Sequence, residues 1–353
     1  MLRNVIESLA QGAVLSQEDA HKTMEAIMGG EATAAQIGGI LIALRLRGET
    51  PAEITGFARA MRQAAEPFTC KGELADTCGT GGDGAGIFNI STTVAFVVAA
   101  CGLPVAKHGN RAITSKCGSA DLLAALGVEI DLNPHQVAWC IEEAGMGFLF
   151  APTFHRAMRH AAGPRRELGI RTVFNLLGPL TNPAAPTFQA LGVWDGKLVR
   201  TVAEVLQSLG VKGAMVFHGA GGLDELSLAG ENIIAELENG SIREYSLLPQ
   251  DLGFEPAPLS AVRGGDPHEN ASITLEILSG QRGPKRDVVL LNAAALLKVS
   301  GRAKSWQEAI AMAGEAIDTG RALERLEALK KAAREVKSRA LRDCRSKTQA
   351  ASN

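Results

Sequence analysis

The chain has 353 residues, enough for one large domain or two domains of ordinary size. Its 36 Lys and Arg residues nearly balance 38 Asp and Glu, so the net charge of -2 gives no general attraction to nucleic acid or membrane. Apolar residues make up 46% but aromatic residues only 4%, which favours helices packed on a buried parallel sheet.

The first residues, MLRNVIESLAQG, place apolar side chains at helical spacing and do not resemble a signal peptide. No apolar run in the chain is long enough to cross a bilayer. None of the six cysteines lies in a C-x-x-C pair, so we expect free thiols, with neither disulfides nor a zinc site. These features predict a cytoplasmic protein.

Residues 1–70 carry helix signals only. Ser16 and Thr33 stand where N-cap residues are expected, and the run Thr-Pro-Ala-Glu at 50–53 forms a capping box. We therefore expect a small N-terminal helical domain.

From about residue 71 the pattern changes, and short strands alternate with helices. Strands are expected in the runs ELADT, LPVAK, MGFLF, FQALGVW and GAMVFHG, with helices at 91–100, 120–126 and 198–206. Such alternation predicts a mostly parallel sheet, while an Asn-Gly pair at 239–240 predicts an antiparallel hairpin. The expected fold class is α/β, with the larger α/β domain at 71–164 and 191–340. Residues 341–353, basic and then polar, are expected to form a disordered tail.

A glycine-rich loop follows the first expected strand. Residues 79–84, GTGGDG, match the dinucleotide fingerprint G-x-G-x-x-G, but the second strand ends in Lys107 where that fingerprint needs an acid. A cation there suits phosphate, and Ser91 and Thr92 at a helix N-terminus suit it as well. Asp83 is open to two interpretations: a contact to a sugar hydroxyl or metal, or a turn residue bonded to its own backbone.

A second polar loop, at 107–119, follows the next strand. Lys107, Arg111, Ser115 and Ser119 are the groups that a diphosphate would bind, whereas His108 is better interpreted as a packed or solvated residue. Since the carboxyl ends of parallel strands lie side by side, the two loops can face one ligand. Together they predict a binding site for a phosphorylated sugar.

Five runs extend this interpretation: GTGGDG, NIST, KHGNR, RRELGIRTVFNLLGPLTNP and LDE. They resemble anthranilate phosphoribosyltransferases, in the family's order, over most of the chain to about residue 320. The resemblance implies transfer of the phosphoribosyl group of phosphoribosyl diphosphate (PRPP) to anthranilate in tryptophan biosynthesis, with release of diphosphate. It also implies Mg²⁺, a homodimer formed through the small domain, and helices around 165–190 that return to that domain.

The resemblance further implies the site residues. The PRPP contacts would be Gly79, Gly82, Asp83, Ile87, Asn89, Ile90, Ser91, Thr92, Lys107, His108, Gly109, Asn110, Arg111, Ala112, Ile113, Thr114, Ser115 and Ser119. Gly79, Asn110 and Arg165 would contact anthranilate, and Ser91, Asp224 and Glu225 would hold the metal. Ile87 replaces a frequent Thr, which removes one hydroxyl contact.

The same residues have plainer interpretations when they are taken alone. Asp224-Glu225 is then an acidic surface loop, and Arg165 and Arg166 are two solvated cations. Two functions compete with this one. The first is a nucleoside phosphorylase of the same fold, and the second is a non-catalytic member of the fold that binds nucleic acid through the basic stretch at 334–347. The displacement needs no strong general base, because an aromatic amine is unprotonated at pH 7, and no catalytic residue is assigned.

Overall fold

The computed structural model describes residues 1–82, 84–112 and 116–350, with side chains described as far as residue 339. A seven-stranded sheet in the order β3-β2-β1-β4-β5-β6-β7 forms its centre. The strands are β1 (Ala75–Gly79), β2 (Val105–Gly109), β3 (Met146–Phe150), β4 (Phe188–Gly192), β5 (Gly213–His218), β6 (Asn232–Glu238) and β7 (Ser241–Leu247). The first five pair in parallel and the last two are antiparallel, which confirms the expected mostly parallel sheet.

The hairpin at the edge of the sheet turns where the Asn-Gly pair predicted. Asn239 has φ of 50° and Gly240 has φ of 74°, so both residues are left-handed. This is the backbone twist that a two-residue hairpin loop needs, and Asn and Gly adopt it most readily.

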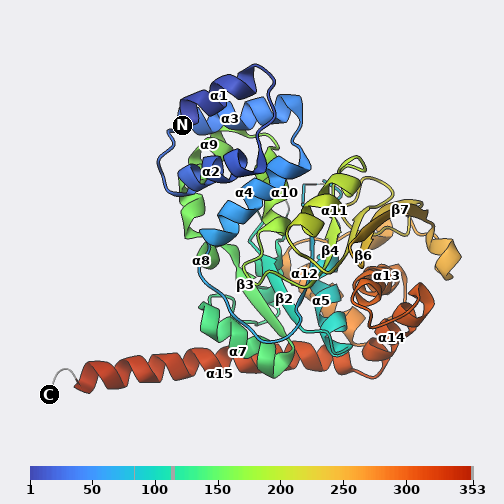
Figure 1. Ribbon diagram of the computed structural model, residues 1–353. Helices are drawn as coiled ribbons and strands as arrows, with labels where there is room; N and C mark the ends of the chain where they lie inside the picture. The colour runs from blue at the N-terminus through green and yellow to red at the C-terminus, as the bar shows by residue number, and fades with distance from the viewer. Residues whose placement is uncertain (83, 113–115, 351–353) are drawn as a thin grey trace.

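Six helices form a separate lobe, at the top of Figure 1, which we call the helical lobe. It consists of α1 (Leu2–Ala10), α2 (Gln17–Met28), α3 (Ala34–Arg47), α4 (Pro51–Gln63), α9 (Arg159–Leu168) and α10 (Val173–Leu180). The caps are those expected: Ser16 Oγ accepts a hydrogen bond from the Asp19 N–H at 3.0 Å, and Thr50 and Glu53 complete a capping box. α9 packs against α2 and α3, and α10 packs against α3 and α4.

The remaining helices surround the sheet. They are α5 (Ile90–Ala100), α6 (Ser119–Ala125), α7 (Pro134–Ala144), α8 (Ala151–Phe154), α11 (Leu198–Ser208), α12 (Pro267–Leu278), α13 (Pro284–Val299), α14 (Trp306–Asp318) and α15 (Arg321–Ala350). Alternate strand residues face opposite sides. Ala190 and Met215 belong to the core shared with α5 and α13, whereas Leu191 and Val216 belong to the core shared with α11 and the helical lobe.

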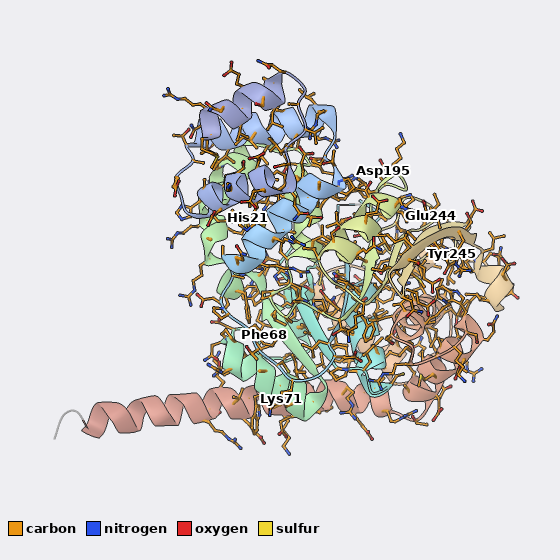
Figure 2. All side chains as sticks on the ribbon, in the orientation of Figure 1. His21, Phe68, Lys71, Asp195, Glu244 and Tyr245 are labelled. Atoms are coloured by element: carbon orange, nitrogen blue, oxygen red, sulfur yellow. The ribbon has the colours of Figure 1, made fainter. Side chains whose placement is uncertain are left out.

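The connection between α4 and β1 leads from the helical lobe to the sheet. Phe68 in this segment meets Phe154 edge-on, with ring centroids 6.0 Å apart, and Figure 2 shows Phe68 below the helical lobe. The Glu66 N–H donates to the Phe154 carbonyl at 2.8 Å, and Arg62 Nε donates to the Leu180 carbonyl at 2.9 Å. The return of the chain through α8–α10 is therefore tied to the end of α4.

The last helix differs from expectation. α15 continues to Ala350 and extends beyond the body of the molecule, where a disordered tail had been expected from residue 341 (Figure 1). The stretch contains no Gly or Pro and is rich in Ala, Arg, Lys, Glu and Leu, which are strong helix formers. Among the helices of the described residues, none is both long and apolar enough to cross a membrane.

Candidate active site

The site begins where β1 and β4 end, at the paired residues Gly79 and Gly192. A Cβ atom at Gly192 would overlap the backbone of Asp224, and one at Gly79 would overlap the Asp224 carboxylate. Glycine at both strand ends therefore lets the loop after β5 lie across the carboxyl edge of the sheet.

The two acids of that loop bind the backbone of the phosphate-binding segments. Asp224 Oδ2 accepts a hydrogen bond from the Gly81 N–H at 2.6 Å, and Glu225 Oε1 accepts one from the Ser91 N–H at 3.0 Å. Asp224 is only 8% exposed and Glu225 only 6%, so the interpretation of this pair as an acidic surface loop is wrong. The pair instead ties the glycine-rich loop and the start of α5 to β5.

These carboxylates suit a hard cation. Mg²⁺ is typically bound by one or two carboxylates, with substrate phosphates and water completing an octahedron. In the part of the chain that the structure describes, no group of three or more His, Cys, Asp or Glu residues gathers as a metal site. The donor set of Asp224, Glu225 and the Ser91 hydroxyl fits Mg²⁺ whose remaining ligands are diphosphate oxygens and water.

Lys107 lies beneath the phosphate-binding segments and not in an open loop. It is 2% exposed, and its Nζ donates to the Thr77 carbonyl at 2.6 Å and to Ser91 Oγ at 3.3 Å. Burial raises the pKa of the neighbouring Asp76 carboxyl, and the Lys107 ammonium opposes that rise. The lysine thus orients the Ser91 hydroxyl and adds positive charge under the loops, a more indirect position than a diphosphate contact.

The second loop is organised by Asp121, which the sequence analysis did not single out. Asp121 Oδ2 accepts from the N–H groups of Ala112 at 2.8 Å and Gly118 at 3.0 Å, and its Oδ1 pairs with Arg111 Nη1 at 3.0 Å. The Ser119 hydroxyl donates to the Asn110 carbonyl at 3.3 Å. Arg111 is therefore held by a carboxylate from the first turn of α6, the helix that follows its loop. Ile113, Thr114 and Ser115, like Asp83 in the first loop, lie outside the described residues.

The predicted residues Ile87, Ile90 and Thr92, which follow the glycine-rich loop, pack against the rest of the protein. Ile87 forms a bridge with Arg263, and Ile90 and Thr92 are both 1% exposed in the first turn of α5. The hydroxyl oxygens of Thr92 and Thr80 are buried with no hydrogen-bond partner among the described residues. Because such atoms are rare in folded proteins, both hydroxyls are suited to a ligand. Thr80, the second residue of GTGGDG, was not predicted.

His108 is packed, as its plainer interpretation predicted. Its ring lies 5.0 Å from that of His155, centroid to centroid, and burial lowers the pKa of His108 to about 3 and that of His155 to about 4. Both imidazoles are therefore neutral at physiological pH. The Gly109 position needs glycine, because a Cβ there would overlap Ser119 Oγ.

The segment that holds α9 and α10 carries the three arginines of the run RRELGIR, at 165, 166 and 171. Arg165 and Arg166 lie in the last turn of α9, which Gly169 ends with φ of 61°. Arg165 is half-buried with its guanidinium 4.8 Å from the Phe174 ring centroid, and burial lowers its pKa, whereas Arg166 is exposed.

Arg171, another residue missed from the sequence, connects the helical lobe to the glycine-rich loop. Its guanidinium donates to the Gly82 carbonyl and lies 5.1 Å from the centre of the Trp194 ring. A long-range contact of this kind leaves no local signal, although the position within the RRELGIRTVFN run marks the segment as a whole.

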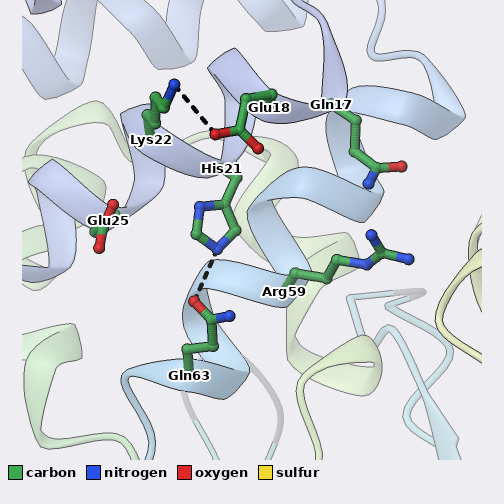
Figure 3. Close-up of a pocket in the computed structure, with 7 residues that line it drawn as sticks. All are labelled: Gln17, Glu18, His21, Lys22, Glu25, Arg59 and Gln63. Carbon is green, nitrogen blue, oxygen red and sulfur yellow. Dashed lines mark hydrogen bonds and ion pairs between the residues drawn. The ribbon is translucent and has the colours of Figure 1, made fainter.

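A separate surface pocket of about 330 Å³ lies between α2 and α4 (Figure 3). Most of its charged groups already have protein partners. His21 Nε2 meets Gln63 Oε1 at 2.8 Å, Lys22 pairs with Glu18 at 3.1 Å, and Arg59 donates to the Ser208 carbonyl at 2.8 Å. We therefore place the candidate site at the strand ends and not in this pocket.

A helical lobe joined to a largely parallel sheet, with a glycine-rich loop and a second polar loop at its carboxyl edge, is the arrangement of an enzyme of the glycosyl transferase family. The family described as "Glycosyl transferase family, helical bundle domain" matches residues 3–65, and "Glycosyl transferase family, a/b domain" matches 71–323. The chain belongs to the anthranilate phosphoribosyltransferase family.

Relatives support that assignment along nearly the whole chain. The anthranilate phosphoribosyltransferase of Desulforudis audaxviator is 57% identical over 92% of this chain and 94% of its own. The crystal structure of the Thermus thermophilus enzyme has a TM-score of 0.89 at 47% identity, covering 93% of this chain and 99% of that one. The Saccharomyces cerevisiae enzyme, solved in complex with PRPP and Mg, has a TM-score of 0.87 at 30% identity, covering 95% and 98%.

Proposed function

We propose that this chain transfers the phosphoribosyl group of PRPP to anthranilate, giving N-(5-phosphoribosyl)anthranilate and diphosphate, at the loops between β1, β2 and β5. The observation that carries the proposal is the pair Asp224 and Glu225, which are buried and bonded to the backbone of both the glycine-rich loop and α5. A carboxylate pair beside backbone N–H groups suits a metal-bound diphosphate and would repel an anion without the metal.

The chemistry needs charge stabilisation more than proton transfer. Breaking the bond from ribose C1 to diphosphate leaves positive charge on the ring and negative charge on the leaving group. The N-terminus of α5, the hydroxyls of Ser91 and Thr92 and the buried Lys107 ammonium all present positive potential or hydrogen-bond donors to that anion. Mg²⁺, when bound, would supply further positive charge there.

Arg165 is proposed to bind the anthranilate carboxylate, with Asn110 and Gly79 beside it. The guanidinium is half-buried against Phe174, and two parallel hydrogen bonds from one guanidinium match the geometry of a carboxylate. The aromatic amine of anthranilate, which is unprotonated at pH 7, is the group that attacks C1.

Mixing the protein with PRPP, Mg²⁺ and anthranilate should decrease anthranilate fluorescence, because the amine becomes substituted. Inorganic phosphate with a nucleoside should give no turnover, which distinguishes the nucleoside phosphorylase. A DNA mobility shift that decreases with salt would favour the nucleic-acid-binding alternative. Folded protein that leaves anthranilate unchanged would contradict the proposal.

We also propose a homodimer formed through the helical lobe. The apolar run of α3 does not supply the contact surface, because Ile37, Ile40, Leu41 and Leu44 are buried within the lobe itself and Ile42 is half-buried. The surplus lies at Leu46, which is 83% exposed, and at Val14, which is 58% exposed. Burying these two side chains against a second copy would remove apolar surface from water, which is the gain we propose for the interface.

Leu46→Glu should therefore convert a dimer into a monomer in light scattering at micromolar concentration, because a charge cannot be buried there without a partner. Ile233→Glu is the control, since Ile233 is 41% exposed on β6 outside the helical lobe and should leave the mass unchanged. A monomeric mass for the unsubstituted chain would contradict the dimer. We further propose a cytoplasmic location, where thiols such as the five described cysteines, which form no disulfide with one another, stay reduced.

A further inference from the structure

The residues from 262 to 270 lie against the end of the glycine-rich loop, although about 180 residues of chain separate them. Phe88 N–H donates to the Val262 carbonyl at 3.2 Å, and Gly264 N–H donates to the Gly86 carbonyl at 3.0 Å. A Cβ atom at Gly264 would overlap both the Phe88 backbone and Asn270 Oδ1. This close contact brings the first turn of α12, with Asn270, to the base of the phosphate-binding loop.

Asn270 is 2% exposed and bonds at both ends of its amide. Its Oδ1 accepts from the Gly265 N–H at 2.8 Å, and its Nδ2 donates to Asn89 Oδ1 at 2.9 Å. Asn89 in turn donates from Nδ2 to the Cys117 carbonyl at 3.1 Å. The series thus links the 262–265 segment, the first residue before α5 and the second loop.

The backbone groups at the two ends of this series of hydrogen bonds have fixed donor and acceptor roles. A backbone N–H can only donate and a backbone carbonyl can only accept, so Gly265 and Cys117 determine which way each amide between them is turned. The Asn89 side chain is therefore held with its oxygen toward Asn270 and its NH₂ group toward the second loop. One N–H of that group binds the Cys117 carbonyl, and the other is the hydrogen with which Asn89 would meet a phosphate oxygen.

We propose that Asn270 is a positioning residue that fixes the amide of Asn89 so that it presents N–H, and not C=O, to the phosphate oxygens of PRPP. The inference rests on the proposed function. A phosphate oxygen accepts hydrogen bonds and offers no donor at neutral pH, so a reversed Asn89 amide would replace attraction by repulsion.

The test is a double-mutant cycle between Asn270→Asp and Asn89→Ala, read out by PRPP binding in calorimetry and by the PRPP Michaelis constant. The introduced carboxylate still accepts from Gly265 but offers only an acceptor to Asn89 Oδ1, so the Asn89 amide must turn or lose its contact with residue 270. We expect a loss of about tenfold in PRPP affinity, the size of one hydrogen bond to a charged group. In the Asn89→Ala background the same substitution should change PRPP affinity by less than about twofold, since no amide is left to turn.

An equal loss in both backgrounds would overturn the proposal, because it would show that the introduced carboxylate acts on PRPP without Asn89. Should Asn270→Asp fail to fold, Asn270→Ala removes the donor to Asn89 and is compared in the same two backgrounds. Thr274→Val is the matched structural control, since it deletes the 3.1 Å hydroxyl contact between Thr274 and Thr93 one turn along α12. It should lower Tm and leave PRPP affinity unchanged.

A structural role alone predicts a different pattern, in which Asn270→Asp and Thr274→Val lower Tm alike and neither separates PRPP affinity from the anthranilate Michaelis constant. That pattern would also overturn the proposal. Calorimetry with PRPP and Mg²⁺ keeps the two claims distinct. Absent turnover of anthranilate by the unsubstituted chain would count against the proposed function, while the PRPP affinities would still decide the role of Asn270.

Discussion

Replacing Asp224 by Asn and Glu225 by Gln in one variant should abolish turnover while the fold persists. Each new amide keeps an oxygen that can accept the hydrogen bond now given by the Gly81 or Ser91 N–H, so the loops stay connected. The two negative charges that would hold Mg²⁺ are lost, and the diphosphate charge is left uncompensated. Metal-derived stabilisation of several kcal/mol corresponds to a decrease in kcat/KM of at least about a thousandfold.

A matched control uses another adjacent acid pair of the same chain. Glu142 and Glu143 are exposed on α7, so changing both to Gln removes the same charge far from the strand ends. The measurements are the rate at limiting and saturating Mg²⁺ and the thermal midpoint of both variants. Near-wild-type turnover at limiting Mg²⁺ after the substitutions at Asp224 and Glu225 would show that these acids only support the loops.

The parallel strands and the hairpin could be predicted because their signals are local. Each expected strand is a short apolar run bounded by Gly, Pro or polar residues, and Asn239-Gly240 is a turn in two residues. α12 and α13 were not predicted. α13 is buried on several sides, with consecutive buried residues from Val288 to Leu291, so it lacks the one-sided apolar stripe that identifies a surface helix.

The candidate site likewise contains residues that local motifs predicted and residues that they did not. The loops and their helix N-terminus are contiguous motifs, and they were predicted with the right elements, α5 and β2. Asp121, Arg171 and Asn270 act through partners that lie 9, 89 and 181 residues away in the chain. Nothing in the sequence near any of the three specifies such a partner. The burial of the Lys107 side chain could not be predicted for the same reason, because its partners Thr77 and Ser91 belong to other elements.

Substituting Arg165 by Gln should weaken anthranilate binding and spare PRPP. Desolvation is the cause of the lowered pKa of Arg165, and its guanidinium stacks on Phe174, so the charge is held at low dielectric where a carboxylate would bind it well. A hydrogen bond to a charged group contributes about 1.5–3 kcal/mol. The anthranilate Michaelis constant should therefore rise roughly ten- to hundredfold, provided that chemistry is slow relative to dissociation.

Arg165→Lys and Arg166→Gln complete this experiment. Lysine keeps the charge but cannot make two parallel hydrogen bonds to one carboxylate, so it should recover only part of the lost affinity. Arg166 is exposed one residue further along the last turn of α9, and its loss should change the anthranilate Michaelis constant by less than about twofold. A larger effect from Arg166→Gln, or a shift of the PRPP constant in Arg165→Gln, would assign the carboxylate of anthranilate to another residue.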